Sequence, residues 1–116
     1  MECLAYQGRG TTPKMFRKGT DRGDKALKMV SEGDRLFAED LDKDELGPAY
    51  RGSGADYKTF ISVAVATQNH PYGMVTVDAP HAGDLVDTDA QIVMFMADLL
   101  AIAFAVAEDE NGLAAP

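Results

Sequence analysis

The sequence has little with which to cross-link itself. Of its 116 residues only Cys3 is a cysteine, so no internal disulfide can form, and none is tryptophan. Disulfide frameworks are typical of small secreted domains, whereas intracellular proteins keep their thiols reduced. The scarcity of cysteine therefore excludes a disulfide scaffold and predicts a cytoplasmic protein.

Basic residues are missing from half of the chain. All eleven Lys and Arg lie in residues 1–58, together with eleven acids, and the eight acids after Lys58 have no basic counterpart. The net charge of −8 argues against nucleic acid as a partner, because binding phosphates requires a basic face. Two interpretations of the acidic second half stay open: solvated acids around a buried core, or a surface for a basic protein partner.

Long apolar runs are also missing. The longest, residues 92–107, has 16 residues and contains Asp98, whereas a bilayer core requires about 20. The first twenty residues carry four basic residues around short apolar pieces, which is not the pattern of a signal peptide. We therefore expect no membrane partner and interpret residues 92–107 as a buried helix.

The length and composition fit one compact domain. We expect it to span residues 1–111, with residues 112–116 as a disordered tail. Hydrophobic periodicity predicts an α+β fold with a central antiparallel sheet. Its expected elements are strands at 2–6 and 13–19, a helix at 25–32, a strand at 35–38, a loop at 39–55, strands at 59–66 and 73–77, and a helix at 92–107.

Single residues predict where some of these elements begin and end. Asp24 is expected to cap the first helix, and Gly33 to end it. Asp87 or Thr88 is expected to cap the last helix. Gly73 is expected to open its strand where a side chain would be disfavoured.

Three segments resemble parts of GAF domains. Residues 32–40 (EGDRLFAED) look like the family's helix end, glycine, short strand and aspartate. Residues 60–65 (FISVAV) and 72–78 (YGMVTVD) look like its core hairpin, and DTD at 87–89 with the apolar helix looks like its closing element. The chain departs from the family in lacking its long first helix, its core-hairpin proline and the Asn-Lys-Phe-Asp-Glu signature of cyclic-nucleotide-binding members.

The resemblance implies helices packed on the faces of the sheet and a sensory or regulatory function in signal transduction. It also implies a ligand site between the sheet and the loops after the short strand, at Phe37, Asp40, Tyr50, Arg51, Tyr57 and Ser62. Tyr50 and Tyr57 offer rings for stacking, and Arg51 offers a charge for an anion. The sequence identifies neither the ligand nor a cofactor. A purely structural interaction subunit without a ligand stays open as the alternative.

No catalytic or metal-binding pattern can be recognised. Cys3 and the two histidines lack the neighbours of a nucleophilic site, and the acids at 40–44 lack the glycine and glutamate of a calcium loop. The His and Asp residues between 70 and 87 match no metal-ligand spacing. Some GAF proteins reduce free methionine sulfoxide with several cysteines around the pocket, and this chain has only one. We therefore predict no catalytic residue, no enzyme activity and no metal.

The helix at 92–107 is apolar on every side, which predicts that two of its faces are covered. The stripe of Ile92, Phe95, Leu99, Ile102 and Val106 is expected to cover the chain's own sheet. The second face is then expected to pair with a second copy of the chain, through Val93, Met96, Leu100, Ala103 and Phe104. We therefore predict a homodimer, alongside a small-molecule ligand or a protein partner.

Overall fold

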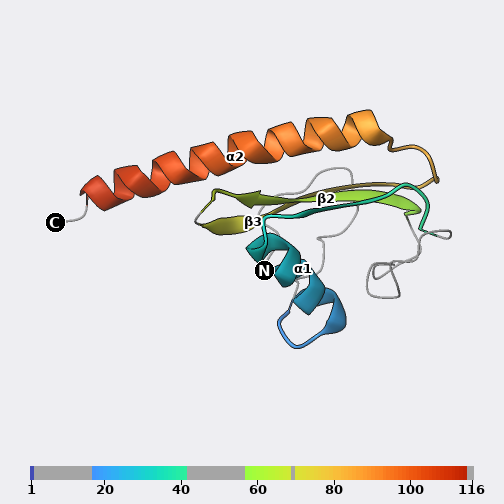
Figure 1. Ribbon diagram of the computed structural model, residues 1–116, viewed down its shortest axis with the longest axis horizontal. Helices are drawn as coiled ribbons and strands as arrows, with labels where there is room; N and C mark the ends of the chain where they lie inside the picture. The colour runs from blue at the N-terminus through green and yellow to red at the C-terminus, as the bar shows by residue number, and fades with distance from the viewer. Residues whose placement is uncertain (2–16, 42–56, 69, 115–116) are drawn as a thin grey trace.

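The computed structural model describes residues 1, 17–41, 57–68 and 70–114. Their order is α1 (Asp21–Ser31), β1 (Arg35–Ala38), β2 (Thr59–Ala66), β3 (Pro71–Ala79) and α2 (Asp87–Ala114). The three strands form one antiparallel sheet, with α2 along one face and α1 beneath the other (Figure 1). The predicted α+β class is confirmed. The predicted strands at 2–6 and 13–19 lie outside the described residues, apart from residues 17–19, which lead into α1 without forming a strand.

Strand β2 is the centre of the sheet, as its apolar composition predicts. It pairs with β1 on one side and β3 on the other, and seven of its eight residues are buried. Residues paired across the strands share a face, so Phe37, Ile61 and Val77 form one row and Leu36, Ser62 and Thr76 form the next. Ile61, Val63 and Val65 pack under α2, whereas Phe60 packs with Ala38 and Leu41 in a separate cluster. The side chains of β2 thus build two cores, one on each face of the sheet.

Helix α1 begins four residues before the predicted start. Its N-cap is Thr20, whose hydroxyl accepts a hydrogen bond from the Gly23 amide at 3.0 Å. Asp24, predicted as the cap, lies inside the first turn and accepts instead from the Gly19 amide at 2.8 Å. Gly33 follows the helix with a φ of +65°, so its predicted role at the helix end is confirmed.

The side of helix α2 that faces the sheet is the opposite of the one we predicted. Val93, Ala97 and Ala101 are buried against β2 at four-residue steps. The stripe expected to cover the sheet (Ile92, Phe95, Leu99, Ile102 and Val106) is between 51% and 64% exposed. Alanine methyl groups let the helix axis approach the sheet closely, and larger side chains in those places would hold it away. The prediction of the sheet-facing side was therefore wrong.

The prediction about Gly73 is also wrong. The glycine whose surroundings leave no room for a side chain is Gly23. Gly73 has an ordinary φ, and a Cβ there would meet nothing within 4 Å. A Cβ on Gly23 would instead collide with the backbone carbonyl of Arg17, which cannot swing aside as a side-chain tip can. Close approach of another backbone requires glycine at this position of α1.

We expect Gly23→Ala to lower the free energy of unfolding by about 1–3 kcal/mol, despite the better helix propensity of alanine. The turn containing Arg17 must shift to admit the methyl group, and the Thr20 cap is part of the same turn. Gly73→Ala is the matched control and is expected to change stability by less than about 0.5 kcal/mol. Urea denaturation of both variants checks the pair, and equal stability of the two would contradict the packing at Gly23.

Candidate functional site

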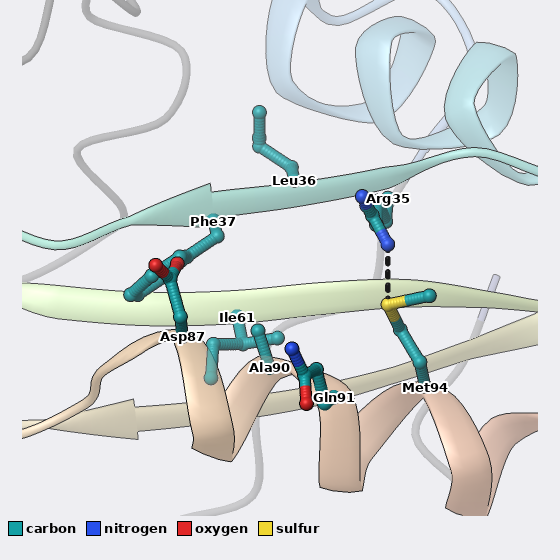
Figure 2. Close-up of a pocket in the computed structure, with 8 residues that line it drawn as sticks. All are labelled: Arg35, Leu36, Phe37, Ile61, Asp87, Ala90, Gln91 and Met94. Carbon is teal, nitrogen blue, oxygen red and sulfur yellow. Dashed lines mark hydrogen bonds between the residues drawn. The ribbon is translucent and has the colours of Figure 1, made fainter.

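A groove of about 440 Å³ runs between the edge strand β1 and the first two turns of α2. Two opposite charges lie at the two ends of the groove. Arg35 is at one end and Asp87 at the other, with the polar Gln91 between them on α2 (Figure 2). Apolar side chains make up most of the rest. The complete lining is Arg35, Leu36, Phe37, Ile61, Asp87, Ala90, Gln91 and Met94.

Two regular elements hold these side chains. Asp87, Gln91 and Met94 are four and three residues apart, so they follow one side of α2. The start of that helix is fixed by Asp89, whose carboxylate accepts a hydrogen bond from the Val86 amide at 2.9 Å. On the other wall, the Arg35 guanidinium donates to the sulfur of Met94 and so connects β1 with α2 (Figure 2).

The residues predicted to bind a ligand are not gathered in one place. Phe37 lines the groove beside α2, whereas Ser62 lies in the neighbouring row on the other face of the sheet and shares a 2.9 Å hydrogen bond with Thr76. Tyr57 does not line the groove either and packs in the cluster of Phe60, whose ring it meets edge-on at 6.3 Å. Asp40 is half-buried and does not line the groove. Tyr50 and Arg51 lie outside the described residues.

Nothing in the sequence indicated that Arg35, Asp87 and Gln91 belong to one site. Each has the polar side chain that an ordinary surface carries, and Arg35 and Asp87 are 52 positions apart in the chain. They become neighbours only because α2 crosses the sheet beside β1, which no local pattern in the sequence records. We therefore take the groove as a candidate site that sequence reasoning missed.

The second candidate surface is the outward side of α2. Its large apolar side chains are 40–64% exposed: Ile92, Phe95, Met96, Leu99, Leu100, Ile102 and Val106. Of the residues predicted for a dimer contact, Met96, Leu100, Ala103 and Phe104 are exposed, but Val93 is buried in the chain's own core and is corrected here. Such contiguous apolar exposure on a soluble protein marks an interaction surface.

The same helix is longer than the apolar run suggested. By length and composition alone, the segment Asp87–Asp109 is long and apolar enough to cross a membrane. Only 17% of the most apolar 18 residues of this segment are buried in the fold. The 16 residues counted from the sequence were the apolar run alone, whereas this segment adds the polar first turn from Asp87, where the helix start was expected, and two residues after the run. The expectation that no membrane is involved is not tested by the structure.

An aromatic cluster fastens the second half of α2 to β3. The Tyr72 ring stacks on Phe104 at 5.4 Å and lies 4.6 Å from His70. The Tyr72 hydroxyl donates to the Glu108 carboxylate at 2.6 Å. This hydrogen bond, together with desolvation and the nearby negative charges of Glu108 and Asp109, raises the pKa of Tyr72 to about 12. The phenol proton is therefore held by the contact.

The raised pKa of Tyr72 makes this contact sensitive to alkaline pH. Its stabilising effect is fully present below pH 10, the ordinary pKa of tyrosine, and is lost as the pH rises through about 12. We expect wild type to be more stable than Tyr72→Phe at pH 9, and the difference to shrink by pH 12. Thermal unfolding at both pH values checks this, and the ultraviolet difference spectrum between the two proteins reports the phenol pKa directly. A phenol that titrates near 10 would contradict the hydrogen bond.

Metal ligands do not gather in the described residues. They contain no group of three His, Cys, Asp or Glu side chains placed to hold an ion. Within the stretch of His and Asp residues between 70 and 87, His81 and Asp84 come together as two ligands at most. Their Nδ1 and Oδ2 atoms are 3.4 Å apart. The prediction of no metal stays a prediction, because residues 2–16 and 42–56 lie outside this description.

Comparison with solved structures places this arrangement in a known fold. The chain is similar to the type II free methionine-R-sulfoxide reductase from Thermoplasma acidophilum, with a TM-score of 0.54 and 22% sequence identity. The match covers 66% of this chain and 52% of that one, so it spans about half of the reductase. The fold is GAF-like. No family model and no curated protein matches the sequence.

This likeness corrects the prediction that the chain is not an enzyme. That prediction assumed that a GAF-like chain without a recognisable catalytic pattern is a regulatory module, yet the similar structure is that of a reductase. At 22% identity the likeness shows the fold alone, and a fold serves catalysis as well as regulation. The absence of a familiar motif was therefore no sound argument against activity.

Proposed function

We propose that the chain is a GAF-like regulatory module of the cytoplasm that self-associates through the outward side of α2. Membership of the GAF family is part of this proposal, supported by the α+β fold and its likeness to a GAF-like structure. A helix shared by two chains would provide a direct physical connection through which a change in one copy affects the other.

The observation that carries the proposal is the spacing of the exposed side chains on α2. Ile92, Phe95, Leu99, Ile102 and Val106 follow one another at steps of three, four, three and four residues, and each is at least 51% exposed. This is the spacing of a coiled-coil seam, in which side chains of one helix fit between those of another. A two-fold pairing of α2 would cover the stripe in both copies at once.

Charge placement favours a protein partner over a lipid for this helix. Acids lie at its start (Asp87 and Asp89), within it (Asp98) and near its end (Glu108 and Asp109). A carboxylate in the centre of a bilayer is costly, whereas at the edge of a helix pair it stays in water. In addition, one side of α2 already packs on the sheet through Val93, Ala97 and Ala101. A spanning helix would have to give up that core.

Sedimentation equilibrium of the purified chain tests the proposal. We expect a dimer at concentrations around 10 µM, which requires a dissociation constant of about 1 µM, or about 8.2 kcal/mol of binding free energy. Flotation with neutral phosphatidylcholine vesicles distinguishes the lipid alternative, and the protein is expected to stay in the unbound fraction. A monomer at high micromolar concentration, or recovery with the vesicles, would refute self-association through α2.

A further inference from the structure

We infer that the groove between β1 and α2 binds a short zwitterion, such as a dipeptide, with its carboxylate at Arg35 and its ammonium at Asp87. This site shares only Phe37 with the ligand site expected from the sequence. It is also separate from the exposed stripe of α2 and does not depend on the proposed self-association. The inference rests on three features of the groove: its charged ends, their separation and its apolar floor.

The two charged ends are available for a ligand. Among the described residues, the acceptor of the Arg35 guanidinium is the Met94 sulfur, and a thioether is a weak acceptor for a group with five N–H donors. A carboxylate would bind the same guanidinium far better, through two parallel hydrogen bonds. Within the described part of the chain, the Asp87 carboxylate has no hydrogen bond or ion pair, and it lies in the first turn of α2, where the helix dipole favours the ionised form.

The separation of the ends determines the length of the ligand. The backbone positions of Asp87 and Met94, whose sulfur accepts from the Arg35 guanidinium, are seven residues apart on α2, or roughly 10 Å at 1.5 Å per residue, and we take this rise as the approximate distance between the two ends. One charged hydrogen bond of about 2.8 Å at each end leaves roughly 5 Å between the ligand's own charged groups. In a free α-amino acid both groups are attached to one carbon, which is too short. In a dipeptide the two Cα atoms are about 3.8 Å apart, which places the ammonium and carboxylate at the required distance.

The middle of the groove suits the body of such a ligand. Phe37, Ile61 and Ala90 provide an apolar floor, and the Gln91 side chain projects from α2 between the charged ends (Figure 2). Its amide both donates and accepts hydrogen bonds, as a peptide group does. The volume of about 440 Å³ is within the range of small-molecule sites. The lining therefore offers a partner for each part of a dipeptide.

Titration with L-alanyl-L-alanine, followed by ¹H–¹⁵N correlation spectra, tests the inference. We expect saturable shifts centred on the amides of Phe37 and Gln91. The N-acetylated dipeptide, the dipeptide amide and free L-alanine are each expected to bind at least about tenfold more weakly, because each lacks one charged contact or the required length. These ligands test the unchanged protein, so the result does not depend on how a variant folds. 5-Aminopentanoate, which keeps the length without the peptide group, is expected to bind with a dissociation constant between those of the dipeptide and free alanine.

Variants of the two charged residues complete the test. Arg35→Gln and Asp87→Asn are each expected to raise the dissociation constant at least about tenfold. Lys28→Gln and Asp21→Asn are the matched controls, since they make the same changes of charge on α1, across the sheet, and should leave binding unchanged. No shifts with about 10 mM dipeptide, equal binding of free alanine, or undiminished binding by both groove variants would each overturn the inference.

Discussion

Replacing Leu99 with glutamate is expected to convert the proposed dimer into a monomer without unfolding the chain. Leu99 is at the centre of the exposed stripe on α2, and its side chain is 52% exposed in the single chain. In the isolated chain a glutamate there stays in water, whereas a two-fold contact would bury two carboxylates close together. Desolvation and like-charge repulsion oppose that burial, so we expect the dissociation constant to rise at least about 100-fold, which is about 2.7 kcal/mol.

Gln68→Glu is the charge-matched control for this variant. Gln68 is exposed in the turn between β2 and β3, so the substitution adds the same charge away from the stripe. Sedimentation equilibrium should show a dimer for Gln68→Glu and a monomer for Leu99→Glu, while their circular dichroism spectra should coincide. If Leu99→Glu still sediments as a dimer, the contact between copies uses another surface.

The sequence was informative wherever one physical requirement dominated. The strand Thr59–Ala66 was predicted with its observed bounds, because a run of β-branched and apolar residues between turns satisfies both faces of a central strand. Gly33 marked the end of α1 because few other residues adopt a positive φ there. We predicted the wrong N-cap for α1, because Thr20 and Asp24 both have side chains suited to that position. Only the turn at Arg17 determines which one the helix uses.

Helix α2 shows why periodicity could not assign its faces. Both sides are apolar, so the three- and four-residue steps are equally regular for Ile92, Phe95 and Leu99 and for Val93, Ala97 and Ala101. We assigned the stripe with the larger residues to the sheet from its spacing alone. The sheet instead selects the side with the smaller side chains, since helix and sheet must interlock at close range. Side-chain volume, rather than hydrophobicity, was the deciding quantity.

The groove could not be predicted for a different reason. Its two charged ends come from β1 and α2, and the contact between these elements, which includes that of Arg35 with Met94, exists only after α2 has docked. The sites that we did predict were carried over from the GAF resemblance. That resemblance could not show that the sheet separates Phe37 from Ser62. Adjacent strand residues point to opposite faces, so a set of residues near in sequence can belong to two different surfaces.

Ile61→Ala is expected to cause the largest loss of stability in the single chain. Ile61 is 1% exposed, pairs with Phe37 and Val77 across the sheet, and belongs to the core cluster that includes Val93 and Ala97. Its removal leaves a cavity that the sheet and α2 cannot both close, at a cost of about 2–5 kcal/mol in the free energy of unfolding. If that variant does not fold, Ile61→Val is expected to cost about 0.5–1.5 kcal/mol.

Ile102→Ala is the matched comparison, because it deletes the same atoms from a side chain that is 60% exposed in the single chain. Urea denaturation at two protein concentrations separates the two sites. The loss at Ile61 should be the same at both concentrations, since it lies within one chain. The loss at Ile102 should appear only where the dimer is populated, since only the partner helix covers it. A concentration-independent loss at Ile102 equal to that at Ile61 would mean that Ile102 is covered by its own chain, and the outward side of α2 would no longer be free to bind a second copy.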